Sequence, residues 1–234
     1  MTGAVNIFKK EFKGYFITPV AYIVISIFLI LTGWFFFSTF FLYGQADMRS
    51  FFSLLPVIFS FIIPAVTMRL FSEEFNTGSY ELILTMPVSG LDIIIGKFTA
   101  AVAFVAVMLV PTFFYGIVIS FIGDIDWGPV AGGYMGAVLL GAAFSAIGLF
   151  ASSLTRNQII AFITGMSLCF VLTLIDKMLF FLPEGALNVF QYLGADFHFQ
   201  NISRGIIDSR DILYFLSVCF VMLYGTALVI QEKT

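Results

Sequence analysis

Long runs of apolar residues alternate with short polar segments along the whole chain. Six of these runs are long enough for helices that cross a bilayer, which needs about 20 apolar residues rising about 1.5 Å each. Lipid cannot satisfy exposed backbone groups, so helices are expected, and the runs are too long and uniform for barrel strands. The pattern predicts an all-α membrane protein. The expected spans are residues 20–42, 52–68, 98–122, 130–149, 159–182 and 212–230.

The polar segments around these runs predict three further features. Residues 1–19 place Phe8, Phe12 and Phe16 on one helical face with Lys9 and Lys13 off it, which indicates an amphipathic helix lying in the membrane interface. Residues 72–90 form an inner loop, and residues 183–211 form an extracytoplasmic segment with one or two short surface helices. We find no linker, so residues 1–234 are interpreted as a single domain.

Composition supports a membrane location and excludes several other classes. The chain is 60% hydrophobic and only 11% charged, whereas soluble domains are about 25% charged. The net charge of −3 and the isoelectric point near 5.0 give no general basic surface for nucleic acid. A soluble, disordered or disulfide-stapled protein is therefore excluded, and the lipid bilayer is the expected solvent.

The distribution of Lys and Arg predicts the orientation. The side that holds the N-terminus, residues 69–97, residues 152–158 and the C-terminus carries seven of these residues, and the other side carries four. The positive-inside rule then places both termini in the cytoplasm. Asp176 and Lys177, near the outer end of span five, are expected at the interface, and His198, the single histidine, is expected on the outer surface.

The loop after the second span contains the clearest local signals. Thr77-Gly78-Ser79 indicates a turn and a helix start, and a helix of about two turns should end before Pro87. Ser89 and Asp92 are spaced as a capping box that opens the next helix. Such a short helix, held out from the membrane, could dock another protein or pack back on its own bundle.

A stripe of small residues runs along span four at steps of four. Small residues let another helix approach closely. The stripe indicates either a dimer seam or packing inside one bundle, and packing inside the bundle is the favoured interpretation. The stripe consists of Gly133, Ala137, Gly141 and Ser145.

The string TMRLFSEEFNTGSYELILTMPVSGLDIIIGKF resembles the characteristic region of ABC-2-type transporter permeases, and is closest to the gliding-motility-associated and nitrous-oxide-reductase-maturation group. The resemblance implies a bacterial inner-membrane permease that forms a homodimer or heterodimer and docks cytoplasmic ATPase subunits through a coupling helix in this loop. A membrane protein with a large extracytoplasmic domain is a further implied partner. The implied coupling residues are Arg69, Glu73, Glu74, Thr77, Gly78, Ser79, Tyr80, Glu81, Leu84 and Pro87.

The chain lacks the G-x-x-x-x-G-K-[ST] phosphate loop, so we expect no cofactor in it, and we expect ATP and Mg²⁺ on a separate subunit. An intramembrane protease would need further membrane-embedded acids or a histidine to activate water, and no histidine lies in any expected span. A secondary transporter usually has ionisable residues near the bilayer middle, which most spans lack. An exporter of hydrophobic or amphipathic cargo is therefore favoured, and a non-transporting anchor or mechanotransmission subunit stays open.

Overall fold

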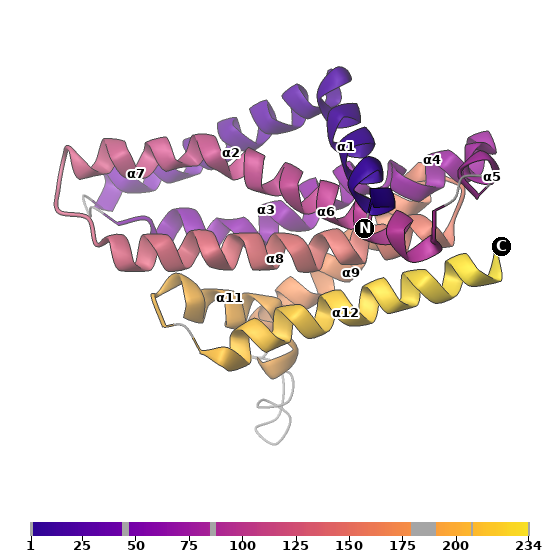
Figure 1. The fold of residues 1–234 in the computed structure, drawn as a ribbon. Helices are drawn as coiled ribbons and strands as arrows, with labels where there is room; N and C mark the ends of the chain where they lie inside the picture. Colours follow the sequence, from indigo (N-terminus) through magenta and orange to yellow (C-terminus); the bar gives the residue numbers. More distant parts are fainter. Residues whose placement is uncertain (1, 44–46, 85–87, 179–190, 207, 234) are drawn as a thin grey trace.

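The computed structural model describes residues 2–43, 47–84, 88–178, 191–206 and 208–233. These residues form helices joined by short turns, which confirms the predicted all-α class (Figure 1). The helices are α1 (Thr2–Ile17), α2 (Val20–Tyr43), α3 (Arg49–Thr67), α4 (Arg69–Thr77), α5 (Ser79–Leu84), α6 (Gly90–Leu109), the 3₁₀ turn η1 (Val110–Thr112), α7 (Phe113–Ser120), α8 (Trp127–Leu154), α9 (Gln158–Met178), α11 (Ala195–Ser203) and α12 (Ser209–Glu232).

Six helical segments in the described residues are long and apolar enough to cross a membrane. Helix α8 is the central one, with α3 and α6 packed on one side and α9 and α12 on the other (Figure 1). The outer helices α2, α9 and α12 leave large apolar side chains exposed, including Trp34 and Phe220. An exposed apolar surface of this extent suits lipid rather than water.

The two ends of the bundle differ in what they contain. One end holds α1, α4, α5, the start of α6 and the C-terminus (Figure 1). We call it the terminal end. The opposite end holds the end of α2, the start of α3, the α7–α8 connection and α11, and we call it the distal end.

Local signals in the sequence set several helix boundaries. The Ser89–Asp92 capping box is present, with Asp92 N donating to Ser89 Oγ at 3.1 Å and Ser89 N donating to Asp92 Oδ2 at 3.2 Å. The helix that contains the third span therefore begins at Gly90, eight residues before the predicted Phe98, because the cap sets the start of the helix. Pro111, which cannot donate a backbone hydrogen bond, lies in the 3₁₀ turn between α6 and α7.

The second span also differs from its prediction. It was expected to end at Met68, but α4 follows α3 after a single non-helical residue, and Met68 itself has helical dihedral angles (φ −52°, ψ −33°). Glu73 and Glu74 consequently lie on a helix that continues the span, not in a loop. The amphipathic pattern of α4 allows this extension, because Leu70 and Phe71 are buried while Glu73 is exposed.

The small-residue stripe of α8 packs inside the bundle, as favoured. A Cβ on Gly133 would lie 2.4 Å from the Phe52 ring of α3, and one on Gly141 would lie 2.7 Å from Val105 of α6. Ala137 and Ser145 are completely buried. The stripe is covered by the same chain, so it is not available as a dimer seam.

At the distal end, the prediction of a surface location for His198 is wrong. The ring is 3% exposed and stacks on Tyr214, with ring centroids 4.1 Å apart. Its Nδ1 lies 2.6 Å from Asp211 Oδ1, and its Nε2 lies 3.0 Å from the carbonyl oxygen of Tyr192. Both ring nitrogens thus lie within hydrogen-bonding distance of an oxygen atom. This buried contact fixes α11 to the start of α12.

Candidate functional site

The join between α3 and α4 is held by a serine from another helix. Ser152, completely buried near the end of α8, accepts hydrogen bonds from Phe71 N and Ser72 N, both at 3.0 Å. Its own hydroxyl donates to the carbonyl oxygen of Met68 at 2.7 Å. One side chain thus pairs three polar groups where the helical ladder is interrupted, and it ties α4 to the most enclosed helix of the bundle.

A buried lysine connects α4 to two further helices. Lys97 of α6 is 1% exposed, and its ammonium group donates to Glu74 Oε1 at 2.8 Å and to Glu11 Oε1 at 3.0 Å. Its third bond goes to the carbonyl oxygen of Leu70 at 2.7 Å. An ammonium group has three donors, and all three are used. Because Glu11 belongs to α1, the cluster of Lys97, Glu11 and Glu74 joins α1, α4 and α6; we call it the Lys97 cluster.

The helix α1 is also packed directly against α6. A Cβ on Gly96 would lie 2.8 Å from Ile7 and 2.9 Å from the carbonyl oxygen of Ala4, so the absence of a side chain allows this approach. Tyr15 is 2% exposed. Part of α1 therefore packs on its own bundle, and the location of this helix in the membrane interface stays a prediction.

Next to the Lys97 cluster is a hollow of about 400 Å³ with charged walls from α1 and α4. Arg69 lies at its edge, with the guanidinium carbon 5.1 Å from the centroid of the Tyr15 ring, a cation–π contact. Burial raises the pKa of Tyr15, and the nearby Arg69 partly offsets this shift. The hollow is lined by Lys10, Glu11, Gly14, Tyr15, Arg69, Leu70, Glu73, Glu74, Thr77 and Ser79.

The turn from α4 to α5 has the predicted form. Gly78 has φ +72°, a left-handed conformation that favours glycine, and it ends α4. The Thr77 and Ser79 hydroxyls lie 2.9 Å apart across this turn. On the inner side, Tyr80 packs edge-on against Phe75, with ring centroids 4.9 Å apart. This aromatic contact fixes the direction in which α5 leaves α4.

The helix α5 therefore has two different faces. Tyr80 is 4% exposed and packs back on the bundle, whereas Glu81 is exposed and Leu82 is 67% exposed. Both interpretations of the short helix apply in part: one face anchors it, and the other face is presented at the surface. Ser79–Leu84 is the described part of this helix, and its predicted end before Pro87 lies outside the described residues.

The predicted coupling residues thus divide into two groups. Glu73, Thr77, Gly78 and Glu81 are exposed and Ser79 is partly exposed, so they can contact a partner. Glu74 is 12% exposed and paired with Lys97, Arg69 lies over Tyr15, and Tyr80 is buried, so these three hold the site together. The Leu84 side chain and Pro87 lie outside the described residues.

Sequence reasoning missed four residues of this end: Lys97, Glu11, Ser152 and Lys233. Lys97 was counted as a free cytoplasmic charge, although a lysine that follows Ile-Ile-Ile-Gly inside an apolar helix is a signal for burial. Lys233 donates to the carbonyl oxygen of Ser153 at 2.6 Å and lies 4.4 Å from the centroid of the Phe75 ring. Partial burial and the charge of Arg156 lower the pKa of Lys233. The end of α12 is therefore tied to α4 and α8.

Within the described residues, six helical segments are long and apolar enough to cross a membrane, and buried ion pairs hold α1, α4 and α6 together at one end. These features define a polytopic membrane protein. A family model described as ABC-2 family transporter protein matches residues 5–234. The chain belongs to this family and is a membrane permease component of an ABC transporter. Membership implies that an ATPase subunit works with it. A comparison with curated proteins finds no match.

Proposed function

We propose that the terminal end faces the cytoplasm and receives an ABC ATPase on the exposed face of α4 and α5, and that the Lys97 cluster transmits the movement of that helix pair into the bundle. The observation that carries this proposal is the position of Glu74, which is adjacent to exposed Glu73, about one turn from exposed Thr77, and bonded to buried Lys97. A displacement of α4 pulls on an ionic contact that cannot be exchanged for water without cost.

The contacts of α4 give the route of that movement. Ser152 connects α4 to α8, and Lys97 connects it to α6 and, through Glu11, to α1. Helices α6 and α8 pack against each other in the core. Hydrogen bonds with buried donors or acceptors thus connect α4 to α6 and α8, and through Lys97 to α1. The helix α5 adds the exposed contact surface.

The charge distribution supports the proposed orientation in a bacterial inner membrane. Lys9, Lys10 and Lys13 of α1 lie at the terminal end, where they would be near the anionic headgroups of the cytoplasmic leaflet. Lys97 is neutralised by its buried partners, yet the remaining basic residues still favour this side. Both termini are then cytoplasmic.

The apolar outer surface supports a proposal for the transported class. Exposed Phe, Ile and Leu side chains cover α2, α9 and α12, and a second permease copy, identical or related, would bury part of this surface. A pathway between two such surfaces suits export of a hydrophobic or amphipathic cargo. The sequence of the α4–α5 region supports a place near the gliding-motility-associated group, and with it a further partner that has a large extracytoplasmic domain.

The docking proposal is tested by removing the two exposed carboxylates. The variant Glu73→Gln/Glu81→Gln, purified together with its ATPase subunit, should retain much less ATPase than the parent chain. The permease itself should keep its thermal unfolding midpoint, because neither carboxylate forms an ion pair within the described part of the chain. ATP in the expected complex binds to the ATPase with Mg²⁺, and no cofactor is proposed in the permease.

Glu232→Gln is the matched control, because Glu232 is an exposed carboxylate at the same end of the bundle but on α12. It should retain the ATPase as well as the parent chain does. Full ATPase retention by Glu73→Gln/Glu81→Gln, or equal loss in the control, would remove the assignment of α4 and α5. If the complex hydrolyses ATP in vesicles without moving an amphipathic cargo, a mechanotransmission role replaces export.

A further inference from the structure

A second charged hollow lies at the distal end, away from the ATPase surface. It has a volume of about 480 Å³ and lies between the first turn of α3 and the last turn of α11. Arg49 comes from α3 and Arg204 from the end of α11, so the fold brings together two arginines that are 155 positions apart in sequence. The lining is completed by Ser50, Ser53, Gln200 and Ser203.

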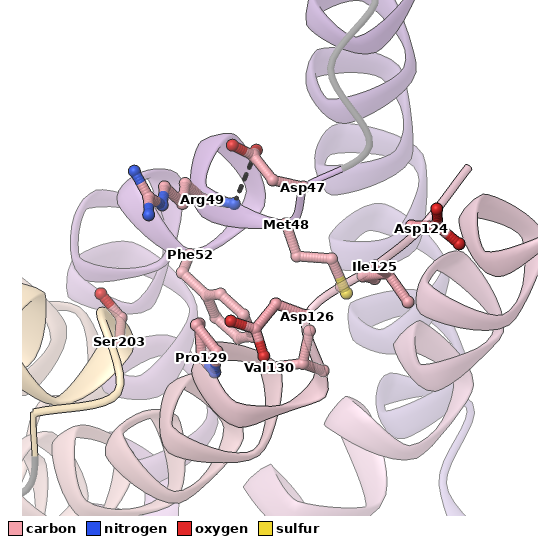
Figure 2. A pocket seen from close by; sticks show the side chains of 10 residues that line it. All are labelled: Asp47, Met48, Arg49, Phe52, Asp124, Ile125, Asp126, Pro129, Val130 and Ser203. Carbon is pink, nitrogen blue, oxygen red and sulfur yellow. Dashed lines mark hydrogen bonds between the residues drawn. The ribbon is translucent and has the colours of Figure 1, made fainter. Parts of the chain in front are cut away.

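The two guanidinium groups are not neutralised by the protein. Neither forms an ion pair with a carboxylate among the residues that the structure describes. Asp47 is the nearest acid in sequence to Arg49, but its Oδ1 accepts the backbone N–H of Arg49 at 3.2 Å, and Figure 2 shows the guanidinium pointing away from that carboxylate. Figure 2 shows a neighbouring hollow that Arg49 and Asp126 both line. Asp126 caps α8 there, because its Oδ1 accepts the N–H of Gly128 at 3.0 Å.

The remaining polar groups favour an anion over a cation. Ser53 and Ser203 donate their hydroxyl protons to the carbonyl oxygens of Ser50 and Gln200, so the arginines supply most of the free donors. The start of α3 adds no free donor at Arg49 N, because Asp47 Oδ1 accepts that N–H at 3.2 Å. Guanidinium groups offer paired donors that match the oxygens of a phosphate.

The surface that continues from the hollow is apolar. Ser50, Ser53, Val57 and Phe61 follow each other on one face of α3 at steps of three and four, and Phe61 is 44% exposed. A polar, positively charged recess therefore leads into an apolar helix surface. An amphiphile with a phosphate head and acyl tails matches this order, whereas a free ion would contact only the charged recess.

We propose that the hollow between α3 and α11 is a binding site for the phosphate group of a membrane amphiphile, with Arg49 and Arg204 as its anion-binding residues. The site lies on the side of the membrane opposite the α4–α5 surface. A cargo or regulatory lipid in that leaflet would contact both α3, which continues into α4, and α11.

The test measures binding of dioctanoyl phosphatidic acid to the full chain in a neutral detergent by isothermal titration calorimetry. Dioctanoylglycerol has the same tails without phosphate, and inorganic phosphate has no tails. The double variant Arg49→Gln/Arg204→Gln should bind the phosphatidic acid at least about tenfold more weakly, since each charge-assisted contact contributes about that factor. Arg210→Gln is the matched control, because Arg210 is an exposed distal-end arginine that does not line the hollow.

Phosphate-dependent binding that is lost in the double variant and kept in Arg210→Gln supports the site. Equally tight binding of inorganic phosphate at the same arginines supports the phosphate site with a soluble source. Binding of dioctanoylglycerol as tight as that of the phosphatidic acid, or binding unchanged in the double variant, overturns the proposal. If the double variant is unfolded by its elution profile, the single variants Arg49→Gln and Arg204→Gln provide the same comparison.

Discussion

Replacing Lys97 with Met tests the buried cluster at the terminal end most severely. Methionine has a similar length and flexibility, so the change removes the charge with little loss of packing. Glu11 Oε1 and Glu74 Oε1 lie 3.0 and 2.8 Å from the same ammonium nitrogen, so without it two carboxylates face each other. Two such charges about 5 Å apart repel by about 3 kcal/mol at an effective dielectric constant of about 20.

This repulsion agrees with the general cost of breaking a buried ion pair, which is about 3–5 kcal/mol. For a chain of this size, that loss lowers the unfolding midpoint by roughly 6–20 °C. The midpoint is measured by intrinsic fluorescence in detergent, with Trp34 and Trp127 as reporters. The double variant Lys97→Met/Glu74→Gln should recover part of the loss, because it removes one of the two opposed carboxylates.

Lys10→Met is the matched control for this prediction. Lys10 lies 3.7 Å from both Glu11 and Glu74, but its side chain is 64% exposed. Exposed pairs contribute less than about 1 kcal/mol, so its midpoint should change little. Equal midpoints for Lys97→Met and Lys10→Met would refute the reasoning, because Lys97 would then contribute no more than a surface charge.

Three further changes test other contacts by the same unfolding assay. Ser152→Ala removes the acceptor of the Phe71 and Ser72 amides and should lower the free energy of unfolding by about 1–3 kcal/mol. An unchanged midpoint would contradict a stabilising role for these hydrogen bonds. His198→Ala removes the hydrogen-bond partner of buried Asp211 and should cost about 1–3 kcal/mol, which is more than the double variant Asp211→Asn/His198→Gln should cost. The raised pKa of Tyr15 keeps this phenol protonated in the fold, so stability should fall as pH rises from about 9 to about 11. Tyr15→Phe should lessen that fall, and an identical pH profile would exclude the effect.

Features set by neighbouring residues could be predicted from the sequence. The capping box at Ser89 and Asp92 and the glycine turn at Gly78 both depend on a few adjacent positions. The six apolar runs could be recognised because the bilayer imposes a length and a composition on each helix. The predicted ends of the spans were less accurate, because amphipathic helical segments extend beyond the apolar part.

Features set by tertiary contacts could not be predicted in this way. Lys97 pairs with Glu11, which is 86 positions away, and His198 is buried by Tyr214 and Asp211 of a later helix. A single sequence shows that these residues are polar but not which partner covers them. For the same reason, the sequence treated Glu73 and Glu74 as equivalent, whereas the structure exposes one and pairs the other.

The central claim is that the exposed face of α5 contacts the ATPase, and site-specific crosslinking measures this contact directly. Glu81→Cys places a reactive thiol on that face, and Ser53→Cys places one at an exposed position of α3 at the distal end. The native cysteines Cys169 and Cys219 are buried. With a short thiol–amine crosslinker in membranes that contain both subunits, the account predicts a permease–ATPase adduct from Glu81→Cys and none from Ser53→Cys. An adduct from Ser53→Cys, or none from Glu81→Cys in a complex that still hydrolyses ATP, would contradict it.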